Sequence, residues 1–182
     1  MTYFGFLLRF LVIPIVILGA VTYVDSRRGR AIPAHFRAWP AWAGILLHVI
    51  LAVVYTTPWD NYLVATGVWY YDPALVTGIV LGWVPIEEYT FFVLQTIMAG
   101  LWIVILMRRL RFPVDPAPLS RAWRVAPVLA LAPIWLAGLA LLLFGWPPGA
   151  YLSLTLVWAL PPIMLQLGFG GEISTDATKP VL

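Results

Sequence analysis

The sequence predicts an all-α membrane protein, a polytopic bundle of about five transmembrane helices. Hydrophobic residues make up 62% of its 182 positions and charged residues only 10%, against roughly 45–50% and about 25% in soluble domains. Apolar runs recur along the chain, and each approaches or exceeds the roughly 20 residues that cross about 30 Å of hydrocarbon. The runs are Tyr3–Val24, Trp39–Thr57, Ala74–Met107, Ala126–Phe144 and Tyr151–Gly170.

The first run is expected to remain in the mature protein as a transmembrane helix. Its basic cluster follows the apolar stretch, and no small-residue cleavage site closes it, unlike in a secretory signal peptide. Arg9 is the only basic residue inside an apolar run. Its long side chain can reach the membrane surface or pair with an acidic residue.

The arginines predict the orientation of the helices, because short loops rich in Arg stay in the cytoplasm. The basic residues of the first and third connections are Arg27, Arg28, Arg30, Arg37, Arg108, Arg109, Arg111, Arg121 and Arg124. The connection Pro58–Pro73 contains no Lys or Arg. We therefore expect a bacterial or archaeal cell-membrane protein with its N-terminus outside and its Arg-rich loops and C-terminal tail inside. The basic loops then need no partner beyond anionic lipid head groups, and no nucleic acid is expected.

The third run is too long for one perpendicular helix, since about 33 residues at 1.5 Å each reach roughly 50 Å. Pro85 is the natural breakpoint, because proline favours the first turn of a helix. Ala74–Val84 is then an interfacial or re-entrant segment, and Pro85–Met107 is the span.

A faint internal repeat predicts how the chain is organised. An offset of 148 residues aligns Tyr3 with Tyr151 and Pro14 with Pro162. Residues 1–110 form a three-helix repeat, residues 111–145 a linker and fourth helix, and residues 146–182 the first helix of a truncated second repeat with a polar tail.

Two adjacent carboxylates, Glu87 and Glu88, lie in the longest apolar run. Ionisable residues at membrane depth are costly and mark function by default. Adjacent helical residues diverge by about 100°, so at least one should face the bundle interior. The alternative is that both are interfacial carboxylates stabilised at a helix N-terminus. A close pair can share a proton, so that one member acts as acid and the other as base.

Asp60 follows the second span, and the expected topology places it on the same side of the membrane as Pro85. It is a third candidate for the catalytic cluster. The alternative is a turn or cap residue, because Asp often bonds its own backbone in turns.

Aromatic residues crowd this side of the chain: Trp59, Tyr62, Trp69, Tyr70, Tyr71, Trp83, Tyr89, Phe91 and Phe92. Trp and Tyr commonly form an interfacial belt. The other interpretation is a lining that holds a polyene and stabilises carbocations through the ring quadrupole, which suits Phe91 and Phe92 best. The candidate substrate-binding residues are Trp59, Asn61, Trp69, Tyr89, Phe91 and Phe92.

The sequence predicts no metal site and no cofactor. It has no cysteine, and its two histidines, His35 and His48, lack metal-ligand spacing. It contains no dinucleotide-binding fingerprint.

Two motifs carry a resemblance to a known family. The stretches Thr57–Asn61 and Pro85–Glu88, the second followed by Phe91-Phe92, resemble the integral-membrane lycopene cyclases, which are small subunits in actinobacteria and tandem copies in archaea and fungi. The resemblance covers roughly Met1–Leu110. It implies a carotenoid end-group cyclase, an isomerase (intramolecular lyase) that works without redox change or cofactor.

The resemblance also implies roles for the residues of the two motifs. An acid protonates the terminal double bond of a linear carotenoid, the neighbouring alkene attacks the resulting cation, and a base removes a proton from the new ring. Glu87 and Glu88 would be that acid and base, with Asp60 and Asn61 positioning groups or relaying protons.

The second repeat departs from the tandem family members, because it lacks a Trp-Asp or Pro-x-Glu-Glu counterpart. The sequence therefore predicts a second cyclase subunit, self-association or a larger membrane complex as partner. A non-catalytic membrane subunit that binds a carotenoid, quinone or lipid, or that packs within a complex such as a photosynthetic one, is the alternative function. A transporter is disfavoured, because its paired halves are missing.

Overall fold

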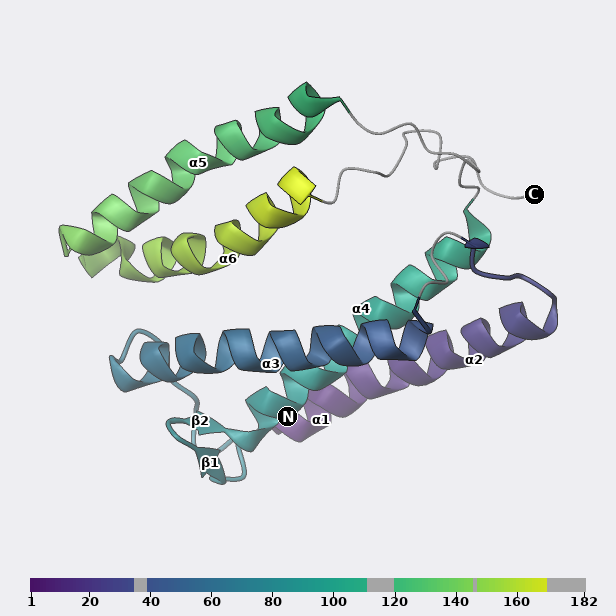
Figure 1. Cartoon of the computed structure of the whole chain (residues 1–182). Coiled ribbons are helices and arrows are strands. Elements are labelled where there is room, and N and C mark those ends of the chain that lie inside the picture. Colours follow the sequence, from purple (N-terminus) through teal and green to yellow (C-terminus); the bar gives the residue numbers. More distant parts are fainter. Residues whose placement is uncertain (35–38, 111–119, 146, 170–182) are drawn as a thin grey trace. The chain divides into compact units, whose positions relative to one another are not determined.

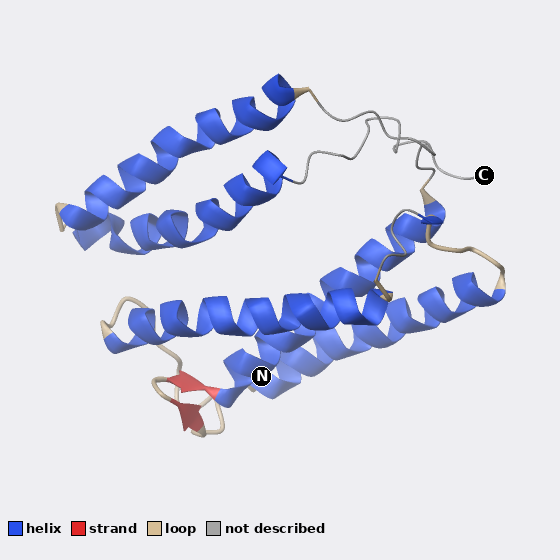
Figure 2. Ribbon diagram, in the orientation of Figure 1, coloured by secondary structure: helices blue, strands red, loops and turns tan. Residues whose placement is uncertain are grey.

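The structure, a computed structural model, describes residues 1–34, 39–110, 120–145 and 147–169, and this part of the chain consists of helices and one small hairpin (Figure 2). The predicted all-α class is confirmed. The elements are α1 (Tyr3–Leu7), the π-helix η1 (Leu8–Val12), α2 (Ile13–Arg27), α3 (Ala41–Ala65), β1 (Val80–Leu81), β2 (Val84–Pro85), α4 (Ile86–Arg109), α5 (Arg121–Leu143), the 3-10 turn η3 (Pro147–Gly149) and α6 (Ala150–Phe169).

Five helical segments in the described residues are long and apolar enough to cross a membrane, the first being α1, η1 and α2 in continuation. Their apolar side chains face outward: at most 17% of the most apolar window of each segment is buried inside the protein. Lipid must supply the apolar surroundings that the chain itself does not, because so much exposed apolar surface marks a membrane contact. The chain is a membrane protein, as predicted.

The chain divides into two compact units, the first ending at Leu110. In the described part of the second unit, α5 and α6 pack against each other and are joined by η3. Trp135 of α5 donates its indole N–H to the carbonyl oxygen of Val157 in α6 at 3.3 Å. Gly138 brings the two helices close, since a Cβ atom there would lie 3.3 Å from the Cβ of Leu156.

In the first unit, α4 packs against both α2 and α3 (Figure 1). Gly100 of α4 lies directly against α3, because a Cβ atom at this position would be 2.6 Å from Cγ1 of Ile45. Leu7, Phe92 and Val104 are among the few buried apolar side chains. The small core is consistent with a bundle whose outer surface is solvated by lipid.

The first transmembrane segment contains a π-helical turn one step before a proline. The backbone N–H of Ile13 bonds to the carbonyl oxygen of Leu8, five residues earlier. Pro14 follows, and it has no N–H with which to continue the regular ladder. The wide turn therefore accommodates the proline while the segment stays continuous.

The predicted boundary of the second span is wrong, because α3 runs through Pro58 and ends at Ala65. Proline removes a single backbone hydrogen bond, which a transmembrane helix tolerates. Pro58 is exposed, while Asp60 and Leu63 on the following turn are buried. Asp60 is thus an inward-facing helical residue, and its alternative interpretation as a turn residue is also wrong.

The predicted break at Pro85 is confirmed. Pro85 is the N-cap of α4, with φ −68° and ψ 150°, and Ile86 is the first helical residue. Before it, β1 and β2 form an antiparallel hairpin in which Val80 pairs with Pro85. The residues between Asp72 and Pro85 therefore form a loop that returns to the start of α4.

At the other end of the first unit, a buried carboxylate that was not predicted as a site residue connects two helices. The side chain of Asp25, 1% exposed, accepts two hydrogen bonds from Arg109, at 2.8 and 3.2 Å, and one from Arg30 at 2.9 Å. Arg108 donates to the carbonyl oxygen of Thr22 at 3.1 Å. These contacts connect the end of α2 to the end of α4.

Candidate functional site

The three candidate carboxylates lie at one end of the first unit, opposite Asp25. The start of α1, the end of α3 and the start of α4 meet there, beside the β1–β2 hairpin (Figure 1). Asp60 belongs to α3, and Glu87 and Glu88 belong to the first turn of α4. The structure therefore brings Asp60 to the same end of the unit as two glutamates that lie 27 and 28 residues further along the sequence.

Two tyrosine hydroxyls hold two of these carboxylates. Tyr3, the first residue of α1, donates its hydroxyl to Oε2 of Glu88, which is half-buried. Tyr71 donates to Oδ2 of Asp60 at 3.0 Å, and Asp60 is 8% exposed. The rings of Tyr3 and Tyr71 stack, with centroids 6.5 Å apart and planes 23° apart. Asp60 and Glu88 thus belong to one connected cluster.

Tyr71 is a hydrogen-bond donor in this cluster. Burial raises the pKa of its hydroxyl, and the carboxylates of Glu88 and Asp60 raise this pKa further. The hydroxyl therefore keeps its proton, because ionisation would place a third negative charge beside two carboxylates.

Glu87 is fully buried and points to different partners from Glu88. Its Oε1 accepts the backbone N–H of Thr77 at 2.6 Å. Its Oε2 has no hydrogen-bond partner among the described residues. Adjacent helical residues diverge, as expected, so the two glutamates contact separate groups, although Glu87 remains within electrostatic range of Tyr3.

The loop before the hairpin covers the cluster. Besides the bond from Thr77 to Glu87, the backbone N–H of Tyr3 donates to the carbonyl oxygen of Leu75 at 2.8 Å. The N–H of Ile86 donates to the carbonyl oxygen of Ile79 at 2.9 Å. The start of α1 and the start of α4 are thereby fixed to the same loop.

Asn61 and Tyr89, both predicted to bind substrate, hold the hairpin through hydrogen bonds. Asn61 accepts the backbone N–H of Trp83 at 2.8 Å, and its amide donates to the Tyr89 hydroxyl at 3.1 Å. Tyr89 donates to the carbonyl oxygen of Leu81 at 2.8 Å. Gly82 has φ +68°, and a Cβ atom there would lie 2.3 Å from Oδ1 of Asn61.

The other predicted binding residues are aromatic and lie close to this cluster or on its two helices. Trp69 is 43% exposed and meets the ring of Tyr71 edge-on at 6.5 Å. Phe91 and Phe92 form an edge-to-face pair with centroids 6.3 Å apart. Trp59 is half-buried on α3, next to Asp60.

Sequence reasoning missed three groups in the site. Tyr71 was included only as a belt aromatic, and Tyr3 and Thr77 were not considered as site residues. A signal for the tyrosines was present, since hydroxyl groups at the same membrane boundary as carboxylates are natural donors to them. No sequence signal identifies Thr77, because it contributes its backbone N–H.

Arg9 pairs with none of the carboxylates in the described residues, and the contact of its guanidinium is with the sulfur of Met1, at 3.7 Å. Likewise, no group of three or more His, Asp or Glu side chains among the described residues could hold a metal ion. His35 and Arg37 lie outside the described residues.

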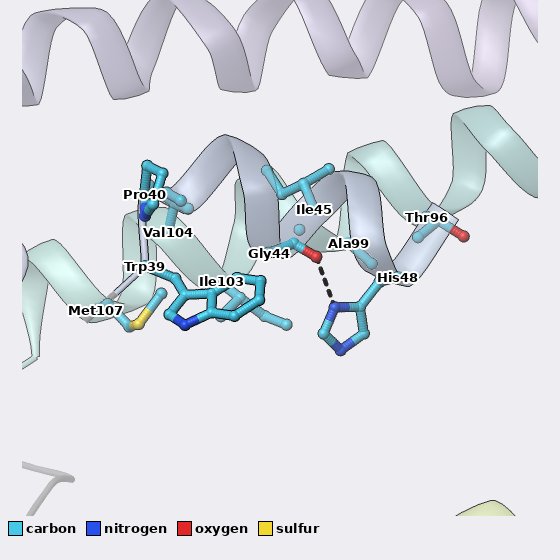
Figure 3. A pocket seen from close by; sticks show the side chains of 12 residues that line it. Trp39, Pro40, Gly44, Ile45, His48, Thr96, Ala99, Ile103, Val104 and Met107 are labelled. Atoms are coloured by element: carbon cyan, nitrogen blue, oxygen red, sulfur yellow. Dashed lines mark hydrogen bonds between the residues drawn. The ribbon is translucent and has the colours of Figure 1, made fainter. Parts of the chain in front are cut away.

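An apolar groove of about 280 Å³ lies between α3 and α4 (Figure 3). Its lining residues are Trp39, Pro40, Ala41, Gly44, Ile45, His48, Thr96, Ala99, Gly100, Ile103, Val104 and Met107. The Nδ1 of His48 donates to the carbonyl oxygen of Gly44 at 2.7 Å, within the same helix. The same two helices carry the carboxylates, and Ala99 is about 16 Å along α4 from Glu88.

Comparisons with known proteins identify relatives that match most of the chain. The chain is 38% identical over 160 residues to a lycopene beta-cyclase of Halobacterium salinarum, which covers 86% of this chain and 60% of that protein. It is 34% identical over 150 residues to a bifunctional lycopene cyclase/phytoene synthase of Aspergillus oryzae, covering 78% of this chain and 25% of that protein. A bifunctional protein of the same description from Podospora anserina is 32% identical over 131 residues, or 68% of this chain and 22% of that protein.

The chain therefore spans about 60% of the length of the archaeal relative and a smaller share of the fungal ones. No family model matches the sequence, and no solved structure matches it significantly. The resemblance seen in the two motifs is confirmed over most of the chain, which is a homologue of the lycopene cyclases.

Proposed function

We propose that this chain is a carotenoid end-group cyclase, or a subunit of one, acting on the ends of lycopene-like polyenes. The observation that carries this proposal is the convergence of Asp60, Glu87 and Glu88 with two tyrosine hydroxyls in an apolar, lipid-embedded bundle. Proton-initiated cyclisation needs an acid, a base and protection of a carbocation from water, and this site offers all three.

Glu87 is the proton donor in this proposal. Its Oε2 is the one buried carboxyl oxygen of the cluster that lacks a partner in the described residues, so no other group of the cluster uses its hydrogen-bonding capacity. The O–H bond of Glu87 breaks as a C–H bond forms at the terminal double bond. The resulting tertiary cation is attacked by the neighbouring alkene, which closes the ring.

Glu88 and Asp60 take the basic role in this proposal, because each accepts a hydrogen bond from a tyrosine hydroxyl and the two tyrosine rings stack, which joins these carboxylates in one cluster. One of them takes a proton from the new ring, and the electrons of that C–H bond form the ring double bond. The two negative charges also stabilise the cation before proton loss. The faces of Phe91, Phe92 and the tryptophans Trp59 and Trp69 contribute cation–π stabilisation where the ligand reaches them.

The groove between α3 and α4 is the proposed place for the unreacted part of the polyene. It is lined almost entirely by apolar side chains. Ala99 lies about 16 Å, and Met107 about 28 Å, along α4 from Glu88, so a linear chain that starts at the carboxylates can run along the helix into the groove.

The Ala99→Phe substitution should therefore reduce cyclisation by raising the KM for lycopene, because the larger ring occupies the groove. Leu51→Phe is the matched control, since Leu51 is 54% exposed on α3 and does not line the groove. The measurement is the rate of ring formation at several lycopene concentrations in liposomes. An unchanged KM for Ala99→Phe would place the polyene elsewhere.

The orientation and partner remain part of this proposal. The carboxylate end lies outside and the arginine-rich end, which includes Arg108 and Arg109, lies in the cytoplasm. A second cyclase subunit, self-association or a larger membrane complex completes the assembly in this proposal.

The proposal is tested by expressing the chain in a lycopene-accumulating bacterium and separating the pigments by chromatography. Cyclised carotenoid is the expected product. Lycopene left unchanged by well-inserted chain, both alone and with co-expressed partner subunits, would favour the alternative of a non-catalytic membrane subunit that binds a pigment, quinone or lipid.

A further inference from the structure

We propose that Tyr71 joins Asp60 and Glu88 into a single proton-accepting unit, and that Tyr3 fixes Glu88 in position within it. Neither tyrosine is part of the two motifs that relate this chain to its family. The inference rests on the proposed function and adds two positioning residues to it.

The geometry of Tyr71 supports the first half of this proposal. Its hydroxyl donates to Oδ2 of Asp60 at 3.0 Å. Its ring stacks on the ring of Tyr3, whose hydroxyl bonds Glu88, and the carboxylate of Glu88 helps to raise the pKa of the Tyr71 hydroxyl. Tyr71 therefore stands between two carboxylates that come from different helices, α3 and α4.

The contacts of Tyr3 support the second half. Its hydroxyl bonds Glu88, its ring stacks on Tyr71, and its backbone N–H bonds Leu75 in the covering loop. Because Tyr3 is fixed through its backbone, its ring and its hydroxyl, it can hold the side chain of Glu88 in one rotamer. Tyr3 thereby keeps the carboxyl group of Glu88 close to Tyr71, which in turn bonds Asp60.

Such a unit solves a problem of turnover. A base that has taken a proton from the ring must lose it before the next substrate. When Glu88 is protonated, it passes its O–H proton to the oxygen of Tyr71 while Tyr71 passes its hydroxyl proton to Asp60. The phenol ends as it began, and no charge is created on it, which its raised pKa would oppose. The reverse transfer returns the proton to Glu88, so the two carboxylates share one proton through the phenol.

A Tyr→Phe substitution distinguishes this relay from aromatic packing alone, because phenylalanine retains the ring and lacks the hydroxyl. Tyr71→Phe is expected to lower kcat about 10- to 100-fold, less than loss of a carboxyl group, with KM nearly unchanged. Tyr3→Phe should behave similarly, and the double variant should lose less than the product of both losses, since the residues act together. Tyr62→Phe, on the 53% exposed Tyr62 of α3, is the matched control.

A spectroscopic measurement tests the unit without relying on turnover. The infrared bands of the Glu88 carboxyl group, assigned with Glu88→Gln, should shift when Asp60→Asn is introduced. In the Tyr71→Phe background this shift should vanish. An equal shift in both backgrounds, or wild-type kcat for Tyr71→Phe in an active protein, would overturn the proposal. An inactive wild-type protein with the expected coupling would count against the proposed function alone.

Discussion

Glu87→Gln, Glu88→Gln and Asp60→Asn should each reduce ring formation by about 10²–10⁴-fold, the usual contribution of a general acid or base. All three substitutions keep an oxygen that accepts a hydrogen bond. The Thr77 N–H, the Tyr3 hydroxyl and the Tyr71 hydroxyl can therefore retain their partners. The substitutions remove the exchangeable proton and the negative charge while leaving the packing of the loop in place.

The measurement is the rate of cyclised carotenoid formation per inserted protein molecule. Asp72→Asn is the matched control, because Asp72 lies in the same loop and is exposed, and its side chain bonds only the nearby backbone N–H of Ala74 among the contacts described. That variant should keep wild-type activity. Full activity in any one of the three cluster variants would remove that carboxyl group from the proposed chemistry.

The sequence was sufficient for the features that depend on composition and local order. Apolar runs of membrane length predicted five helices, and the excess length of the third run predicted its break at Pro85, where α4 is capped. Two short motifs indicated the carboxylates. These signals are local, because the thickness of the bilayer and the backbone of proline act on neighbouring residues.

The contacts between distant segments were not predictable in the same way. Pro58 indicated a helix end, but α3 continues for seven residues beyond it. The pairing of Tyr3 with Glu88 joins positions 85 residues apart, and that of Arg109 with Asp25 joins positions 84 apart. Such pairs depend on how α2, α3 and α4 pack, and hydropathy carries no information on which polar side chains meet.

Asn61 illustrates the same limit within a motif. It lies beside Asp60 in the sequence, and a role in positioning or proton relay was expected for it. On the helix, the two side chains diverge by about 100°, so Asn61 reaches Trp83 and Tyr89 in and near the hairpin while Asp60 reaches Tyr71. A substitution at Asn61 is therefore expected to act through the shape of the hairpin.

Asp25→Ala should strongly destabilise the first unit, although Asp25 lies at the opposite end from the carboxylate cluster. Asp25 receives three hydrogen bonds from Arg109 and Arg30, and its side chain is 1% exposed. Without it, Arg109 and Arg30 lose the carboxylate that connects the end of α2 to the end of α4, and two like charges remain near each other. The apparent Tm in detergent should fall by several degrees or more, and the fall should be greater than that caused by Arg30→Gln, which removes one bond of the three.

A second variant separates charge pairing from mere loss of contacts. Asp25 is the buried member of its pair with Arg109, whose side chain is 47% exposed. Removing the carboxylate alone leaves that guanidinium without its anion, whereas removing both side chains also removes the unpaired charge. Asp25→Leu combined with Arg109→Leu should therefore recover much of the Tm that Asp25→Leu alone loses. If the double variant melted no higher than Asp25→Leu alone, the unpaired charge of Arg109 would not be the cause of the lower Tm. The loss of the hydrogen bonds to Asp25 would then account for it.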